Sequence, residues 1–122
     1  MNQEVKFFKV KNTKNAFLLT SGEIVNNDSI VEIKANTEEA AVEKHIPVYE
    51  VKDNTIEVCV GSVEHPMTDE HYIMWIAQIY NNRVTMVRLT PNDIPKATFE
   101  YVKGSEIYAY CNLHGLWKTT VE

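Results

Sequence analysis

The chain has 122 residues, of which 44% are hydrophobic and 24% are charged, and its formal net charge is −5. This composition is typical of one globular domain with a buried core, and it excludes a disordered chain. The negative net charge disfavours nucleic acid and anionic membranes as partners. Because the N-terminal residues are polar and no apolar run could span a bilayer, we predict a cytoplasmic protein.

Residues 1–36 have the pattern of a small β unit. Apolar residues alternate along EVKFFKV (4–10), KNTKN (11–15) is typical of a turn, and AFLLT (16–20) and EIV (23–25) are expected as strands. This block is too short to bury a core of its own. We therefore predict a small N-terminal β domain that is either an appendage or part of a dimer contact.

Residues 37–122 contain short apolar segments separated by turns about ten residues apart. Residues 37–44 are compatible with a helical turn that starts near Thr37 and equally with a loop. The segments expected as strands are IPVYEV (46–51), TIEVCVG (55–61), VTMVRL (84–89), ATFEYV (97–102) and EIYAYC (106–111). The pattern predicts an all-β fold, an antiparallel β-sandwich with a small N-terminal β domain.

The segment HYIMWIAQIY (71–80) is ambiguous by itself. Its apolar residues fit a helical spacing, and they also fit both faces of a buried strand. The pair Asn81-Asn82 and the apolar run after it are typical of a hairpin, which favours a strand.

The two cysteines differ in their surroundings, and two do not make a disulfide framework. Cys59 lies inside an apolar run, where a small hydrophobic residue in a strand is the simplest interpretation. Cys111 ends a strand-like run and is followed by Asn, Leu, His114 and Gly, which is turn chemistry.

The four histidines all lie where an expected strand begins or ends; they are His45, His65, His71 and His114. A single histidine in such a place is usually a surface or capping residue. However, strand ends from distant parts of a sandwich converge, since its loops gather at two ends. The four imidazoles and the thiol of Cys111 can therefore meet.

Such a donor set has a limited choice of metals. A closed structural zinc site has four ligands, rich in cysteine. A blue-copper site has two histidines, one cysteine and often an axial methionine, for which Met67 is a candidate, but this chain has too many histidines. Five protein ligands with one vacant position fit a catalytic iron, where a thiolate opposite the vacancy donates electron density to the bound ligand.

Three segments, EKHIPVYE (43–50), GSVEHPMTDEHYIMWI (61–76) and CNLHGLW (111–117), together resemble superoxide reductase, the family that includes desulfoferrodoxin and neelaredoxin. The resemblance implies an immunoglobulin-like antiparallel β-sandwich over residues 37–122 as the iron-binding catalytic domain. It also implies the one-electron reduction of superoxide to hydrogen peroxide, with a rubredoxin-type protein as electron donor.

The resemblance further implies a role for each site residue. The four histidines would be equatorial ligands of one mononuclear non-haem iron that cycles between Fe2+ and Fe3+, and Cys111 would be the axial thiolate. Glu43 would ligate the oxidised iron, and Lys44 would lie beside the open face. We also expect the backbone N–H groups of Leu113 and His114 to donate to the sulfur of Cys111.

The N-terminal block resembles the branch of this family whose desulforedoxin-like domain lacks its cysteine ligands. Val10 and Thr13 stand at the expected positions of the first cysteine pair, and Asn26-Asn27 at those of the second. No thiolate remains for a second iron. We expect the block to persist because it packs at a homodimer interface.

Two other interpretations stay open from the sequence. One is an iron-binding electron-transfer or metal-storage β-sandwich that does not turn over superoxide. The other is a metal-free interaction domain. Whatever the function, Trp75 and Trp117 are expected to be core or interface aromatics.

Overall fold

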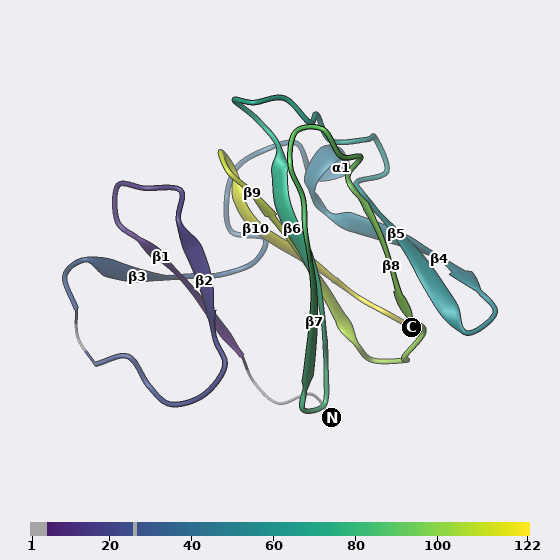
Figure 1. Cartoon of the computed structure of the whole chain (residues 1–122), viewed down its shortest axis with the longest axis horizontal. Helices are drawn as coiled ribbons and strands as arrows, with labels where there is room; N and C mark the ends of the chain where they lie inside the picture. The colour runs from purple at the N-terminus through teal and green to yellow at the C-terminus, as the bar shows by residue number, and fades with distance from the viewer. Residues whose placement is uncertain (1–4, 26) are drawn as a thin grey trace.

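The structure is a computed structural model, and it describes residues 5–25 and 27–122 (Figure 1). The strands are β1 (Lys6–Val10), β2 (Ala16–Leu19), β3 (Ile30–Ile33), β4 (Pro47–Lys52), β5 (Thr55–Val60), β6 (Ile73–Tyr80), β7 (Arg83–Arg88), β8 (Lys96–Glu100), β9 (Glu106–Cys111) and β10 (Gly115–Thr120). The short helix α1 (Val42–His45) precedes β4. Within the described residues, no helix has the length and apolar character needed to cross a membrane.

Within residues 5–25 and 27–122, the strands form three antiparallel sheets, with strand orders β2-β1-β3, β10-β9-β6-β7 and β4-β5-β8. The last two sheets face each other and enclose the main core. The alternation along β5 shows why, because Ile56, Val58 and Val60 are buried while the residues between them are more exposed. These side chains pack with Ile76 of β6 and Ile107 of β9. The predicted all-β antiparallel sandwich with a small N-terminal β unit is therefore confirmed.

The N-terminal sheet covers the outer face of the β10-β9-β6-β7 sheet. The ring of Phe7 in β1 lies 5.5 Å from that of Trp75 and 4.6 Å from that of Tyr108, measured between centroids. Figure 1 shows β1, β2 and β3 gathered on this side of the sandwich. Strand β6 is therefore buried on both faces, which is the physical reason that all of its residues except Gln78 are hydrophobic. The division into domains 1–36 and 37–122 stays a prediction.

Hydrogen bonds hold the turn between β1 and β2. They involve Val10 and Thr13, which stand where the first cysteine pair of the related domains was expected. The hydroxyl of Thr13 donates to the carbonyl oxygen of Val10 at 2.7 Å. The backbone N–H of Val10 donates to the carbonyl of Asn15 at 3.0 Å. Of the second pair, Asn26 lies outside the described residues, and the side chain of Asn27 accepts from the N–H of Ser29 at 2.8 Å.

Two local predictions differ from the structure. The segment 23–25 is not a strand; the third strand of this sheet is β3, which pairs with β1 on the side opposite β2. Strand β10 was not predicted, because its consecutive residues Leu116 and Trp117 are both buried, which hides the alternation. Adjacent strand residues point to opposite faces, so Leu116 packs in the cluster that contains Phe7 and Trp75, whereas Trp117 packs against His45.

The helical turn expected at 37–44 begins further along the chain than Thr37. The helix α1 covers Val42–His45, and the hydroxyl of Thr37 instead donates to the carbonyl of Lys34 at 2.8 Å. The segment around Thr37 is therefore a turn, and the helix is a short element that ends on a histidine.

Candidate metal centre

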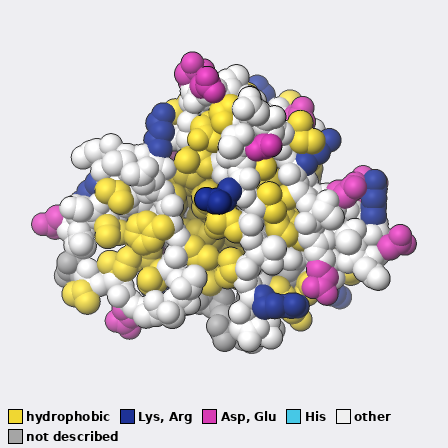
Figure 2. Space-filling model, viewed as in Figure 1, with side chains coloured by type: hydrophobic (Ala, Val, Ile, Leu, Met, Phe, Trp, Pro, Cys, Tyr) yellow, Lys and Arg dark blue, Asp and Glu magenta, His cyan; other side chains and the backbone are white. Residues whose placement is uncertain are grey.

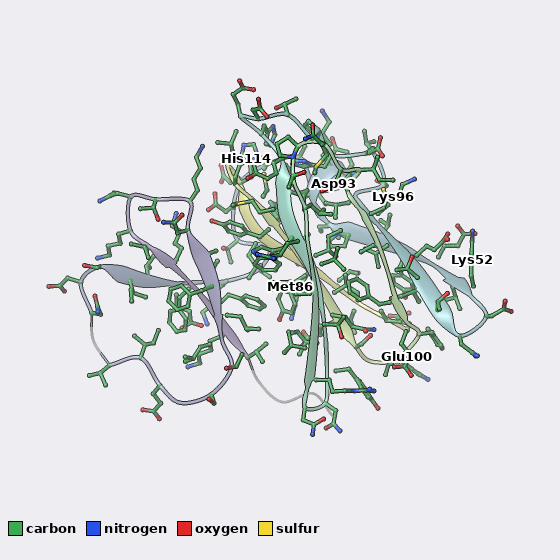
Figure 3. The ribbon with its side chains drawn as sticks, in the orientation of Figure 1. Lys52, Met86, Asp93, Lys96, Glu100 and His114 are labelled. Atoms are coloured by element: carbon green, nitrogen blue, oxygen red, sulfur yellow. The ribbon has the colours of Figure 1, made fainter. Side chains whose placement is uncertain are left out.

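Three connections meet at the end of the sandwich where α1 lies, and Figure 3 labels His114 there. The first is α1, which ends at His45. The second is the β5–β6 connection, which carries His65 and His71, and the third is the turn after β9, which carries Cys111 and His114. Segments distant in the sequence thus deliver all five of the predicted donor residues to one end of the fold.

The four imidazoles form a ring in which each one is nearly perpendicular to its neighbours. The centroid distances are 4.7 Å for His45–His65, 4.6 Å for His65–His71, 5.0 Å for His71–His114 and 4.9 Å for His45–His114. The corresponding interplanar angles are 76°, 79°, 79° and 89°. The rings of His45 and His71 lie opposite each other at 6.2 Å. Four imidazoles around one centre can supply four ligands in a plane.

The ring nitrogens show which atoms face this centre. The Nδ1 atoms of His45 and His65 lie 2.7 Å from the carbonyl oxygens of Ala41 and Pro66. A carbonyl only accepts, so each Nδ1 carries the proton and each Nε2 presents a lone pair. These two Nε2 atoms lie 3.2 Å apart, and the Nε2 of His45 lies 3.1 Å from the Nδ1 of His114.

The remaining imidazole supports the same interpretation. The Nε2 atom of His71 is buried and has no hydrogen-bond partner. A buried polar atom without a partner costs free energy, as do two lone pairs that face each other. A cation at the centre of the ring would resolve both, so the donor set fits a bound metal ion.

The sulfur of Cys111 completes the cluster. It lies 3.9 Å from the Nδ1 of His114, and the candidate ligand atoms of His45, His71, Cys111 and His114 all lie within 4.8 Å of one another. His65 adjoins this group through its contact with His45. Burial raises the pKa of the Cys111 thiol, while the backbone N–H groups of Leu113 and His114 lower it. The effect of these two N–H groups on the pKa has the direction expected of donors to the sulfur, and their donation stays a prediction.

Burial also favours the neutral form of three imidazoles, those of His45, His65 and His71. It lowers the pKa of His65 from 6.5 to about 4 and also lowers the pKa values of His45 and His71. The charges of neighbouring imidazoles lower all three pKa values further. Since only a neutral imidazole can ligate a metal, the site is prepared for an ion at neutral pH.

The loops that carry the histidines are fixed by close backbone contacts. The N–H of His65 donates to the carbonyl of Val60 at 2.8 Å, and the N–H of His71 donates to the hydroxyl of Thr68 at 3.1 Å. Gly61 lets α1 approach, because a Cβ at that position would lie 2.7 Å from the carbonyl oxygen of Glu43. Gly115 has φ +82 and takes the left-handed position that follows a three-residue hairpin turn.

Trp117 contributes to the site in a way that the sequence did not indicate. Its ring lies 5.0 Å from that of His45 at an angle of 31°, and its Nε1–H donates to the carbonyl of His114 at 3.0 Å. It is fully buried, as a core aromatic would be. No local signal separates Trp117 from Trp75, which packs instead against the N-terminal sheet.

Glu43 and Lys44 lie on α1, immediately before His45, and both are exposed. Their charges act on the cluster, since Lys44 lowers the pKa values of His45 and His71, and Glu43 raises that of His45. The carbonyl oxygen of Glu43 accepts from the N–H of Val63 at 2.8 Å, which ties α1 to the β5–β6 connection.

Two other sulfur atoms lie apart from this centre. The sulfur of Met67 accepts the N–H of Ile73 at 3.4 Å, and its side chain packs against the main core. It is therefore engaged elsewhere and does not supply the axial ligand of a copper site. Cys59 lies in β5, as predicted, where it is half-buried.

The fold and the cluster define a class of protein, a β-sandwich with a mononuclear metal centre of histidines and one cysteine. Comparison with known proteins identifies the family. The desulfoferrodoxin family model matches residues 36–120. A desulfoferrodoxin from Clostridium acetobutylicum is 43% identical over 125 residues, which cover 99% of this chain and 100% of the relative. The chain belongs to the desulfoferrodoxin family.

Solved structures agree with this assignment. The superoxide reductase from Treponema pallidum matches with a TM-score of 0.76 and 33% identity, over 97% of this chain and 100% of that one. The superoxide reductase from Giardia intestinalis matches with a TM-score of 0.55 and 29% identity, over 66% of this chain and 98% of that one. The first match extends over nearly the whole chain, so it includes the N-terminal sheet as well as the sandwich.

Proposed function

We propose that this protein is a superoxide reductase, an oxidoreductase that adds one electron and two protons to superoxide and releases hydrogen peroxide. The observation that carries the proposal is the ring of four imidazoles beside the sulfur of Cys111, with the lone pairs of His45 and His65 facing each other. Membership of the desulfoferrodoxin family and the likeness to solved superoxide reductases support it.

The cofactor is one mononuclear iron, and when bound it supplies the electron by passing from Fe2+ to Fe3+. The five proposed ligands are His45, His65, His71, His114 and Cys111. Burial keeps the pKa values of His45, His65 and His71 low, so these three imidazoles offer neutral nitrogens. The N–H groups of Leu113 and His114 hold negative charge on the sulfur and so tune the electron density it donates.

Lys44 and Glu43 are the proposed catalytic residues outside the ligand set. Superoxide is an anion and the protein has a net charge of −5, so attraction to the site requires a local positive field. The ammonium of Lys44 acts on His45 and His71 and can supply this field. The carboxylate of Glu43, on the same helix, is the proposed additional ligand of the oxidised iron.

The partners follow from the same proposal. We expect a rubredoxin-type protein to return the electron, and Leu113, which is 48% exposed and lies two residues after Cys111, offers an apolar contact near the sulfur. We expect a homodimer formed through the N-terminal sheet, over which Figure 2 shows hydrophobic side chains gathered at the surface. The expected location is the cytoplasm.

Rapid mixing with superoxide tests this function against an electron-transfer or storage module with the same ligands. The reduced, iron-loaded protein should react at about 10⁸–10⁹ M⁻¹s⁻¹, near the diffusion limit, and yield one hydrogen peroxide for each iron oxidised. A slow reaction, with iron bound and Cys111 ligated, would identify the protein as an electron-transfer module instead. The Cys111→Ser variant is the control, since it should lose the thiolate-to-iron absorption band.

A further inference from the structure

Strands β6 and β9 separate at the point where each one delivers a candidate ligand. Their backbone ladder ends at the pair Ile73 and Cys111. One position further, the backbone N–H of Asn112 donates to the carbonyl of Tyr72 at 3.2 Å. The return bond is different, because the N–H of Tyr72 donates to the side-chain Oδ1 of Asn112 at 3.0 Å. The side chain of Asn112 therefore replaces a backbone carbonyl and extends the pairing past the end of the ladder.

The same side chain makes a second bond on the other side of His71. The Nδ2 of Asn112 donates to the carbonyl oxygen of Glu70 at 3.1 Å. Asn112 thus holds the residue before His71 and the residue after it, and it is itself covalently linked to Cys111. One amide group spans the gap between the loop that carries His71 and the turn that carries the thiol.

His71 has a particular need for this support. The rings of His45 and His65 are each oriented by an Nδ1–H bond to a carbonyl oxygen. Among the hydrogen bonds of residues 5–25 and 27–122, none of this kind orients the ring of His71, and its buried Nε2 has no partner. The position of the imidazole therefore depends on its backbone, which Asn112 holds from both sides.

The requirement is specific to an amide. The N–H of Tyr72 needs an acceptor and the carbonyl of Glu70 needs a donor, and only one planar group with both functions satisfies the two. An aspartate would keep the acceptor, lose the donor and place a carboxylate oxygen against the Glu70 carbonyl. A leucine of similar size would supply neither bond.

We propose that Asn112 is a positioning residue that sets the place of the His71 imidazole relative to the Cys111 sulfur. The inference rests on the proposed function only in that these two residues bind iron. Partners that orient a ligand typically contribute about 10- to 100-fold to metal affinity. The Asn112→Leu variant should therefore bind Fe2+ about 10- to 100-fold more weakly than the unchanged chain, and its ferric absorption and electron paramagnetic resonance spectra should change.

The experiment compares the full chain with Asn112→Leu and Asn112→Asp, and Asn82→Leu in the β6–β7 turn is the matched control. Affinity for Fe2+ is measured by competition with a chelator, and amide exchange at Tyr72 is measured in parallel. We expect both Asn112 variants to lose affinity and alter the ferric spectrum. The Tyr72 amide should exchange faster in Asn112→Leu, while Asn112→Asp keeps its protection. The control should match the unchanged chain in every measurement.

The results separate this inference from the proposed function. Unchanged iron affinity and an unchanged ferric spectrum in Asn112→Leu would overturn the inference, even if the protein reduces superoxide rapidly. Weakened iron binding in a protein that does not react with superoxide would refute the proposed function and leave the inference standing. If Asn112→Leu does not fold, the affinity and spectrum of Asn112→Asp decide in the same way.

Discussion

The Nε2 atoms of His45 and His65 lie 3.2 Å apart, although both nitrogens are acceptors. Each ring already donates its Nδ1 proton to a carbonyl oxygen, so neither Nε2 has a proton to share. Both side chains are buried, with an exposed fraction of 2%, which prevents water from relieving the contact. The contact between these two nitrogens is therefore unfavourable in the metal-free fold. A cation bound by both lone pairs would make it favourable.

Iron should stabilise the fold for this reason. At a concentration of free Fe2+ about 100-fold above its dissociation constant, the free energy of unfolding should rise by ~2.7 kcal/mol. For a chain of this length, that corresponds to a rise in Tm of about 10 °C. Thermal unfolding of the iron-loaded and the chelated protein, under anaerobic conditions, measures this rise in Tm. Mg2+ is the control, because it prefers oxygen ligands; an equal effect of Mg2+, or no effect of iron, would contradict the prediction.

The stability of the metal-free protein should depend on pH through His65. Burial lowers its folded-state pKa to about 4, below the ordinary 6.5, so the unfolded chain binds the proton more tightly. The neutral His65 side chain contributes fully to the free energy of unfolding above about pH 6.5. This contribution is lost as the pH falls toward 4, and its magnitude is on the order of 3 kcal/mol. Urea unfolding of the metal-free protein at several pH values measures this loss. The His65→Gln variant should show a shallower dependence over the same range; an identical slope would assign the effect to other groups.

Gly61→Ala should displace α1. A Cβ there would lie 2.7 Å from the carbonyl oxygen of Glu43 and 2.9 Å from that of Ile46, and backbone atoms cannot move aside as a flexible side chain can. We expect a loss of about 1–3 kcal/mol in the free energy of unfolding, together with weaker iron binding, because His45 moves with the helix. Urea unfolding and chelator competition measure the two effects. Glu64→Ala, at an exposed position of the same connection, should change both much less; wild-type behaviour of Gly61→Ala would show that α1 tolerates the shift.

Lys44→Ile should slow the reaction with superoxide and flatten its dependence on ionic strength. Removing a cation beside the site weakens the local field that attracts the anion, and steering of this kind is worth about tenfold or more in rate. Rapid mixing with superoxide at several salt concentrations measures both quantities. Lys103→Ile is the control, since Lys103 is exposed and lies beyond the opposite end of β9. Equal rates and equal salt slopes for Lys44→Ile and the control would remove the steering role.

Glu43→Ala should leave the rate of reaction with superoxide nearly intact and change the ferric spectrum, because the carboxylate is proposed to ligate only the oxidised iron. The visible spectrum of the oxidised protein and its pH dependence report this ligand. Glu39→Ala, which removes another exposed carboxylate from the segment before α1, should have no effect. A ferric spectrum of Glu43→Ala identical to that of the unchanged chain would show that Glu43 is no ligand.

The sequence by itself determined most of the strands and the identity of the cluster. Alternation and turn residues located the strands β4 to β9, because a strand with one face in a core shows an alternation of apolar and polar residues in its own sequence. The resemblance to the superoxide reductase family predicted that the four histidines and Cys111 share one site, and the structure brings these five residues together. The roles of Glu43 and Lys44 stay predictions.

Only the tertiary structure decided which neighbours these elements meet. Strand β10 was missed, and β6 was ambiguous, because both are covered on two faces and so lose the alternation that marks a strand. Trp117, Asn112 and Gly61 support the site through contacts with residues far from them in the sequence. Local sequence patterns indicate the element in which a residue lies and the face it occupies. The residues it contacts depend on how the sheets and loops pack together.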